Sequence, residues 1–246
     1  MTEVGVAERL DRVRELVESA ARSSGRSGKV LLLAVSKGQP ASAIRAAYAA
    51  GQRHFGENYV QELEGKSAEL ADLSELRFHL IGHLQRNKAK VVVKHVSALH
   101  SCDSIALAEE LDKRAAGLVI PSERRAFGDD PRLPVLAEIN IANEPQKSGC
   151  NPAQAGALLD VIDEATNLRL AGLMCVPPLS DDPAASVPHF AALAALRDAH
   201  GGPARLPELS MGMTGDFAEA IAAGATVVRI GTAIFGARPP KAPRPG

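Results

Sequence analysis

A lysine stands where an apolar run meets a turn, in the stretch LLLAVSKGQP at residues 31–40. Five apolar or small residues lead into Ser36, and Lys37 follows, with the turn residues Gly38 and Pro40 directly after it. Strands commonly end in polar residues, so a lysine alone at such a place indicates no function. A lysine that is desolvated at the mouth of a barrel can instead lose its proton and attack a carbonyl. The rest of the sequence decides between these two interpretations.

Polar and small residues also follow later apolar runs. Those at the ends of the predicted strands are Lys37, Glu57, Asn58, His83, Ser210, Gly212, Arg229, Gly231 and Thr232. The last two strands are the most informative, because SMGM supplies a hydroxyl and a glycine, and RIGT supplies an arginine, a glycine and a second hydroxyl. In parallel barrels a phosphate site commonly follows strands seven and eight, where small residues let backbone amides approach the phosphate. The alternative is that both glycines only relieve crowding.

A phosphate site opposite a strand-end lysine indicates a particular kind of ligand. Lysine forms a reversible bond with an aldehyde, and the small residues of the last two strands favour a phosphate. A molecule that carries both groups is pyridoxal 5′-phosphate (PLP), the cofactor that proteins hold as a Schiff base with lysine. PLP therefore fits the residue pattern.

A repeated alternation of strands and helices would position these residues. Strands are predicted at 30–36, 53–58, 77–84, 98–103, 135–142, 170–176, 208–213 and 226–236. Helices are predicted between them at 40–50, 58–71, 85–95, 103–116, 151–166, 183–199 and 215–223. Several of the strands are apolar without polar alternation, which is typical of a parallel strand between covering helices and a packed interior.

Eight such units predict a single (β/α)8 TIM barrel, with an open doubly wound sheet as the main rival. An extra helix precedes the barrel, since apolar residues recur there at spacings of three and four, at Val6, Leu10, Val13, Val17 and Ala20. No linker divides the chain, so residues 1–238 are predicted to form one domain. The polar segment 117–134 is predicted to be an exposed loop, and the Pro-rich residues 239–246 a disordered tail.

Composition argues against several classes of function. The 28 Lys and Arg residues nearly balance 29 Asp and Glu residues, and aromatic residues make up 3% of the chain, without Trp. These values disfavour a nucleic-acid or anionic membrane partner. No apolar stretch approaches the ~20 residues that a membrane helix needs, and the first residues lack the pattern of a signal peptide.

Cysteines and histidines give no sign of a metal centre. Cys102, Cys150 and Cys175 are odd in number and form no C-x-x-C pair, so a disulfide framework is disfavoured and a cytoplasmic location is expected. His79 and His83 have a spacing that suits a metal on a helix, but they lie in a strand-like run without a third ligand. No metal is expected.

Six blocks of the sequence resemble one known family. They run in order between about residue 6 and Arg238, and read AVSKGQP, HFGENYVQE, FHLIGHLQRNK, INIANEPQKSGC, GLMCVPP and LSMGMTGDFAEAIAAGATVVRIGTAIFGAR. They are similar to the pyridoxal phosphate homeostasis proteins, the YggS/PROSC family. The resemblance implies the barrel that also forms the N-terminal domain of alanine racemase.

The resemblance also implies roles for individual residues. Lys37 would form the Schiff base with PLP, and Arg229 would face the pyridine nitrogen. Ser210, Gly231 and Thr232 would hold the phosphate. The full predicted set of PLP-binding residues is Lys37, Asn58, His83, Ser210, Gly212, Arg229, Gly231 and Thr232. In this set the asparagine belongs to the GEN motif, and the histidine fills a position that varies in the family.

Arg229 separates binding from catalysis. Enzymes that use the PLP ring as an electron sink usually place a carboxylate at the pyridine nitrogen and keep it protonated. An arginine is cationic and only donates, so the nitrogen stays unprotonated and the ring withdraws electrons poorly. Alanine racemase tolerates such an arginine but adds a tyrosine base from a second domain. This chain ends just after strand eight and has only Tyr48 and Tyr59.

We therefore expect a protein that holds PLP reversibly, supports intracellular PLP homeostasis and passes PLP to apo-enzymes, with no catalytic activity of its own. The alternative is a PLP-dependent amino-acid racemase that works from a single barrel domain. No heptad or apolar patch demands a partner, so a monomer is expected.

Overall fold

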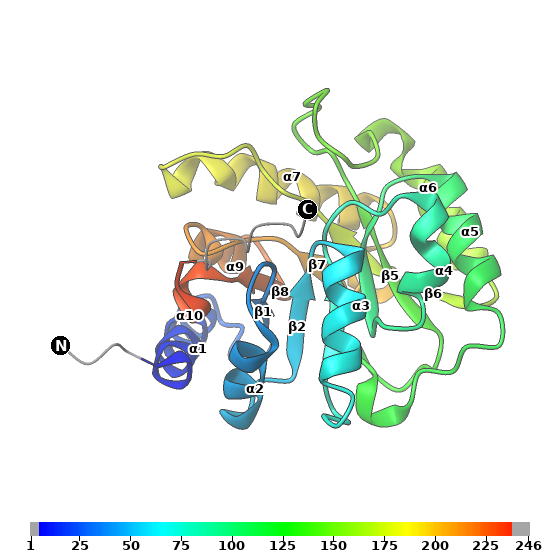
Figure 1. The fold of residues 1–246 in the computed structure, drawn as a ribbon. Coiled ribbons are helices and arrows are strands. Elements are labelled where there is room, and N and C mark those ends of the chain that lie inside the picture. Colours follow the sequence, from blue (N-terminus) through cyan, green and yellow to red (C-terminus); the bar gives the residue numbers. More distant parts are fainter. Residues whose placement is uncertain (1–4, 238–246) are drawn as a thin grey trace.

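Eight parallel strands pair in chain order, and β8 returns to pair with β1, so that the sheet closes (Figure 1). The computed structural model describes residues 5–237. The strands are β1 (Leu31–Val35), β2 (His54–Glu57), β3 (Arg77–Leu80), β4 (Ala98–Cys102), β5 (Leu133–Glu138), β6 (Leu168–Met174), β7 (Glu208–Ser210) and β8 (Val227–Ile230). Every residue of β4, β5 and β8 is buried, as expected for strands with helices outside and a packed interior. The predicted TIM barrel is confirmed.

Helices form the outer layer of the barrel (Figure 1). They are α1 (Val6–Ser23), α2 (Ala41–Ala49), α3 (Val60–Glu69), α4 (Ala89–Val92), α5 (Ile105–Ala115), α6 (Ala155–Glu164), α7 (Val187–Ala199), α8 (Gly202–Arg205), α9 (Phe217–Ala222) and α10 (Thr232–Phe235). Short 3-10 turns add η1 (Arg86–Lys88), η2 (Ser122–Arg124), η3 (Pro152–Gln154) and η4 (Pro183–Ser186). None of these helices, in the range the structure describes, is long and apolar enough to span a bilayer.

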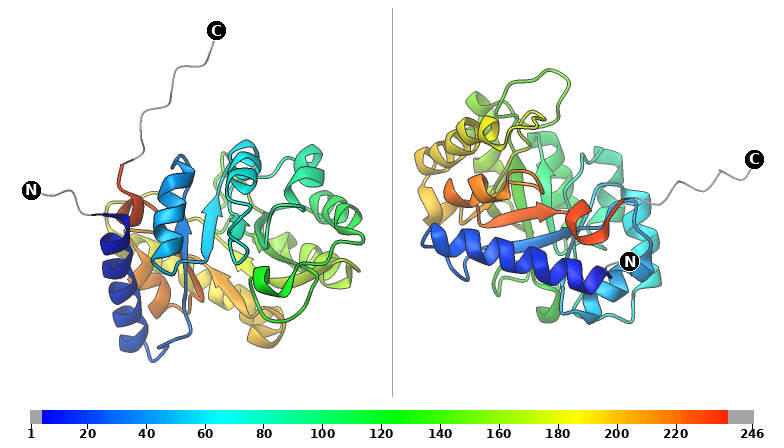
Figure 2. Two further views of the ribbon diagram at one scale, coloured as in Figure 1. Left: turned by 60° about the horizontal axis from the view of Figure 1, so that its bottom comes forward. Right: turned by 90° about the vertical axis from the view of Figure 1, so that its left-hand side faces the viewer.

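The predicted N-terminal helix is present and fills a gap in the outer layer. Helix α10, which follows β8, is only one turn long, and α1 packs against α10, α9 and α2 (Figure 2). The buried residues Leu10, Val13 and Val17 lie along its inner face. Arg9 donates from Nε to the carbonyl of Ile234 at 2.8 Å and so joins α1 to α10. The first helix thus stands where the eighth outer helix of the barrel would stand.

The eighth strand is shorter than the sequence predicts. The apolar stretch 226–236 reads as one long strand, but β8 ends at Ile230 and residues 232–235 form the helix α10. Ile234 and Phe235 are buried by this single turn. Short apolar runs do not distinguish a buried strand from a buried helical turn, and this explains the error.

The segment 117–134 is not simply an exposed loop. Val119 is largely exposed, but Phe127 packs against Leu136, Ala171 and Met174 of the barrel interior. Arg169, near the start of β6, donates to the carbonyl of Phe127 and so ties the loop to the barrel. The loop therefore contributes one aromatic side chain to the barrel interior. The predicted tail at 239–246 lies outside the described residues.

Candidate functional site

A cavity of about 570 Å³ opens at the carboxyl ends of the strands. Its lining includes four of the predicted site residues, Lys37, Arg229, Gly231 and Thr232. They come from the ends of β1 and β8, which pair directly in the closed sheet. The volume lies in the range of sites for small molecules. The structure thus brings these residues together around one space.

Lys37 lies directly after β1, on a turn that its neighbours hold in place. Its side chain is half-buried, and Gly38 follows with a φ of 71°, a value that favours glycine. The backbone N–H of Ser36 donates to the carbonyl of Gly56 at 2.9 Å, which ties the turn to the neighbouring strand. The turn therefore fixes where the lysine leaves the strand.

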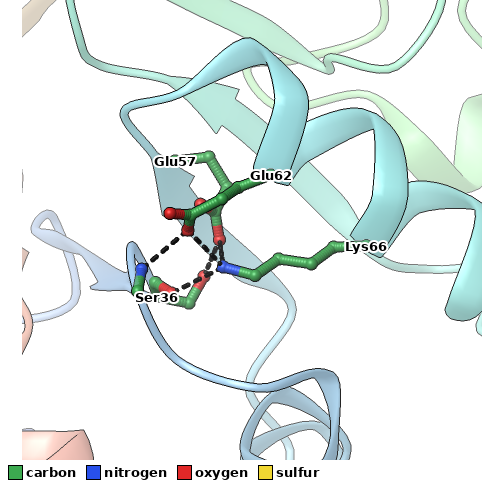
Figure 3. A network of polar contacts seen from close by, with 5 residues as sticks. Ser36, Glu57, Glu62 and Lys66 are labelled. Carbon is green, nitrogen blue, oxygen red and sulfur yellow. Dashed lines mark hydrogen bonds and ion pairs between the residues drawn. The ribbon is translucent and has the colours of Figure 1, made fainter. Parts of the chain in front are cut away.

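A buried ionic network forms hydrogen bonds to the residues on both sides of this lysine (Figure 3). The Ser36 hydroxyl donates to Glu57 at 2.6 Å, and Lys66 Nζ donates to the same carboxylate oxygen at 2.7 Å. Lys66 also donates to the carbonyl of Ser36 at 2.8 Å and to Glu62 at 3.2 Å. Glu62 in turn accepts the backbone N–H of Gly38 at 2.7 Å. One cation from α3 thereby clamps the whole turn.

The Glu57 carboxylate at the centre of this network is fully buried. Burial raises the pKa of Glu57, and the ammonium of Lys66 opposes that shift. Its second oxygen, Oε2, has no hydrogen-bond partner among residues 5–237. The carboxylate therefore depends on Lys66 for its compensation.

Arg229 is held in the barrel interior with only 4% of its surface exposed. Its Nη1 donates to the carbonyl of Ser210 at 2.6 Å and to the Ser210 hydroxyl at 2.9 Å, and its Nη2 donates to the carbonyl of Cys175 at 2.9 Å. No carboxylate of the described chain forms an ion pair with it. Burial lowers the pKa of Arg229, but a guanidinium starts so high that it stays cationic.

Two other predicted residues lie behind the cavity rather than on its lining. The Ser210 hydroxyl is fully buried and is bonded to Arg229 and to His100. Gly212 has a φ of 90°, and a Cβ there would approach the Cβ of Ala220 to 2.5 Å. Its lack of a side chain is therefore needed for α9 to pack.

Asn58 and His83 also lie away from the cavity lining. The side-chain oxygen of Asn58 is buried and has no partner among the described residues. Its backbone passes so close to Gly82 that a Cβ there would lie 2.7 Å from the Asn58 Cα. His83 borders a second hollow, is 53% exposed and contacts Asp103, with 3.1 Å between Nδ1 and Oδ2.

Sequence reasoning missed Thr214, which lines the cavity on the turn after β7. Asp216 shapes this turn, because one of its oxygens accepts the N–H of Met213 at 2.7 Å and the other accepts the hydroxyl of Ser186 at 2.8 Å. The signal was present in GMTGD, where a hydroxyl follows a glycine at a strand end and an aspartate stands before a helix.

Glu138 was also missed. It ends β5 and is nine-tenths buried, and its Oε2 has no hydrogen-bond partner among the residues described. Burial raises the pKa of Glu138 to about 7, and the charge of Asp103 adds to the shift while Arg229 opposes it. In the sequence this glutamate looks like an ordinary polar residue inside an apolar strand.

The cysteines and histidines form no metal centre within the described range. All three cysteines are free and buried. Burial raises the pKa of Cys175 to about 12 and raises that of Cys102 as well, so neither thiol is a ready nucleophile at neutral pH.

A family model and several known proteins match nearly the whole chain. The family model described as alanine racemase, N-terminal domain, matches residues 9–239. A pyridoxal phosphate homeostasis protein of Pseudomonas aeruginosa is 44% identical, with 97% of this chain and 98% of that protein covered. One of Escherichia coli is 42% identical, with 95% and 97% covered.

Two solved structures are also similar to this chain. PipY of Synechococcus elongatus, solved with PLP bound, is 41% identical with a TM-score of 0.77, and the match covers 94% of this chain and 100% of PipY. Alanine racemase of Corynebacterium glutamicum is 16% identical with a TM-score of 0.63, and 62% of it is covered. The racemase shares the barrel fold.

The clamp around the lysine turn predicts a large loss of stability when its cation is removed. Lys66→Met leaves the buried Glu57 carboxylate uncompensated, which should lower the free energy of unfolding by about 3–5 kcal/mol. Urea unfolding measures it. Arg45→Met is the matched control, because it removes a cation from the exposed pair with Asp72 and should change little. Equal losses in the two variants would contradict the clamp.

Proposed function

This chain belongs to the family of pyridoxal phosphate homeostasis proteins, and on that premise we propose that it binds PLP reversibly and supports PLP homeostasis. The observation that carries the proposal is the cavity, which joins the half-buried Lys37 to a buried arginine without a carboxylate partner in the described chain. PipY, which resembles this chain over its whole length, holds PLP in its solved structure. The residues at the cavity fit the chemical groups of that molecule.

Lys37 supplies the reversible covalent bond. After its ammonium has given a proton to solvent, the amine adds to the aldehyde carbon, and a Schiff base forms as one water leaves. Addition of water reverses the step and frees PLP. The clamped turn holds the lysine in place, so the amine reaches the aldehyde without a search over many conformations.

The phosphate fits the part of the cavity that follows β7 and β8. We assign it to the hydroxyls of Thr214 and Thr232 and to the backbone at Gly231, all of which line the cavity. The predicted contact of Ser210 with the phosphate stays a prediction, and it would require the Ser210 hydroxyl to leave a partner that it now has. Gly212, Asn58 and His83 would act from behind or beside the cavity.

Arg229 favours a holder over a catalyst. Its guanidinium would donate to the pyridine nitrogen, and a proton on that nitrogen would lie against a buried cation. Bound PLP supplies a strong electron sink when the ring is protonated and a poor one when it is not. We therefore propose that the protein stores and transfers PLP, with PLP-dependent apo-enzymes as recipients.

The alternative function, an amino-acid racemase, is favoured by one observation. A racemase needs a second proton-transferring group opposite the lysine. Glu138 ends β5, four strands from β1 in the eight-strand barrel, and burial raises its pKa to about 7. Glu138 would be the second proton-transferring group in a weak racemase activity.

Location and assembly complete the proposal. We propose a reducing, cytoplasmic setting, which suits three buried and free thiols. We propose that the domain of residues 1–238 acts as a monomer.

The role of Lys37 predicts a visible absorption band. Protein mixed with PLP should absorb near ~420 nm, as Schiff bases of this cofactor do. Lys37→Ala should abolish the band, whereas Lys88→Ala, an exposed lysine in η1, should keep it. Borohydride reduction and peptide mapping then locate the bond. An adduct on another lysine with Lys37 unmodified would overturn the assignment.

The phosphate assignment predicts a selective loss of affinity. Thr232→Val should weaken PLP binding by roughly 1–3 kcal/mol, the cost of a lost hydrogen bond to a charged group, and leave binding of unphosphorylated pyridoxal unchanged. Ser210→Ala distinguishes two roles. If Ser210 holds the phosphate, Ser210→Ala should weaken the binding of PLP only. If Ser210 acts through Arg229, Ser210→Ala should weaken the binding of PLP and of pyridoxal alike. Equal weakening of both ligands by Thr232→Val would contradict the assignment.

A further inference from the structure

Three histidines and a serine form a hydrogen-bonded chain through the barrel interior. His54 Nδ1 lies 3.0 Å from His79 Nε2, and His79 Nδ1 lies 2.9 Å from His100 Nε2. His100 Nδ1 lies 2.9 Å from the hydroxyl of Ser210, which accepts from Arg229 at 2.9 Å. We call these four residues, His54, His79, His100 and Ser210, the histidine chain.

The histidine chain crosses the inside of the barrel rather than following one strand. His54, His79 and His100 stand on the adjacent strands β2, β3 and β4, with ring centroids 5.2 and 5.1 Å apart. The next contact, to Ser210 on β7, joins strands that are not neighbours in the sheet. His79, His100 and Ser210 are fully buried. The histidine chain therefore links β2 to Arg229 on β8.

Arginine chemistry fixes the direction of the hydrogen bonds. A guanidinium only donates, so the Ser210 oxygen accepts from Arg229 and its hydroxyl proton is free to point to Nδ1 of His100. His100 then carries its proton on Nε2 and donates to His79, which donates from Nε2 to His54. The opposite direction would aim two donors at the serine and leave its own proton without an acceptor among the described residues. Every ring is thereby assigned as the Nε2–H tautomer.

Burial keeps the three rings neutral, as this arrangement requires. Burial lowers the pKa of His54 to about 4 and that of His100 to about 3, and it lowers the pKa of His79 well below its ordinary value. Each neutral ring has one donor and one acceptor; His79 and His100 use both within the histidine chain, and His54 uses its acceptor. The ring of Phe127 packs edge-on against His79 with 5.6 Å between centroids, which helps to exclude water from His79.

The aligned dipoles stabilise a buried cation. In each link the acceptor end points toward Arg229 and the hydrogen points away, so the negative ends of the dipoles face the guanidinium. Hydrogen bonds in such a series polarise one another, which makes the serine oxygen a stronger acceptor. A packing role alone would be served better by apolar side chains, because burying polar rings costs free energy that hydrogen bonds only offset.

We propose that the histidine chain positions Arg229, so that His54, His79 and His100 set the orientation of its guanidinium toward the cavity. This inference rests on the proposed function only in that the ligand of Arg229 is taken to be PLP. The histidine chain would orient the guanidinium as a carboxylate partner would, but without adding negative charge. Arg229 therefore presents a full positive charge to the nitrogen of the bound ring.

The direction of the chain is tested in the free protein. Nitrogen NMR of histidine side chains at neutral pH distinguishes the two tautomers and the protonated ring. We expect His54, His79 and His100 all to be neutral and protonated at Nε2. An Nδ1–H tautomer or an imidazolium at any of the three positions would overturn the inference.

Substitution tests whether the chain acts on Arg229. His100→Leu removes the acceptor of the serine proton, whereas His100→Asn keeps an acceptor near the place of Nδ1. We expect His100→Leu to move the side-chain NMR signals of Arg229 and to weaken PLP binding about tenfold, the equivalent of one hydrogen bond, and His100→Asn to restore most of both. His95→Leu is the matched control, because His95 bonds a serine hydroxyl outside the chain at 3.0 Å.

The outcomes separate this inference from the proposed function. The signals of Arg229 are read without PLP, so a wild-type protein that failed to bind PLP would overturn only the proposed function. Arg229 signals that moved no further in His100→Leu than in His95→Leu would overturn the inference. The inference also fails if His100→Asn behaves like His100→Leu, because the acceptor would then have no role.

Discussion

Arg229 takes a full positive charge into the interior of the barrel, and much of the site follows from the need to compensate it. A buried charge is tolerated only when it is paired or fully hydrogen-bonded. Here the bonds come from Ser210 and from the carbonyl of Cys175, at the ends of β7 and β6. The register pairs Met174 with Ser210 and Ser210 with Val227, which brings these acceptors beside β8. The closed sheet and the buried cation therefore depend on the same register.

Two separate polar networks hold the two cavity residues Lys37 and Arg229. On the β1 side, Glu57 and Lys66 form an ionic clamp around the turn that carries Lys37. Beside β8, Ser210 contacts the cation, and the histidines behind Ser210 extend the network without adding negative charge. The first network uses opposite charges because its task is to fix a backbone turn. The second avoids a carboxylate because its task, in our account, is to present positive charge to a ring nitrogen.

The sequence predicts the barrel and part of the site for simple physical reasons. Eight apolar runs separated by helical segments leave few topologies. Parallel strands bring their carboxyl ends to one rim, and Lys37, Arg229, Gly231 and Thr232 accordingly line one cavity. The boundaries of the strands and helices are harder to predict, because the apolar run at 226–236 suits a strand and a helical turn equally well. The hydroxyl of Thr214 and the clamp by Lys66 depend on a turn and on a helix face, which the pattern does not resolve.

The histidine chain could not be predicted in this way. His79 is noticeable only through its spacing from His83, and that spacing suggests a metal pair rather than a contact with His54 and His100. Contacts across the lumen join residues that are far apart in the sequence, and Ser210 lies 110 positions from His100. Only the closed barrel shows that the serine faces a histidine as well as the arginine.

In the proposed mode of binding, Arg229 keeps the ring nitrogen of bound PLP unprotonated, so that the protein holds the molecule without activating it. The most direct measurement is nitrogen NMR of PLP labelled at the pyridine nitrogen and bound to the wild-type protein. We expect the chemical shift of an unprotonated, hydrogen-bonded pyridine at neutral pH. The shift of a protonated pyridinium would contradict this mode of binding.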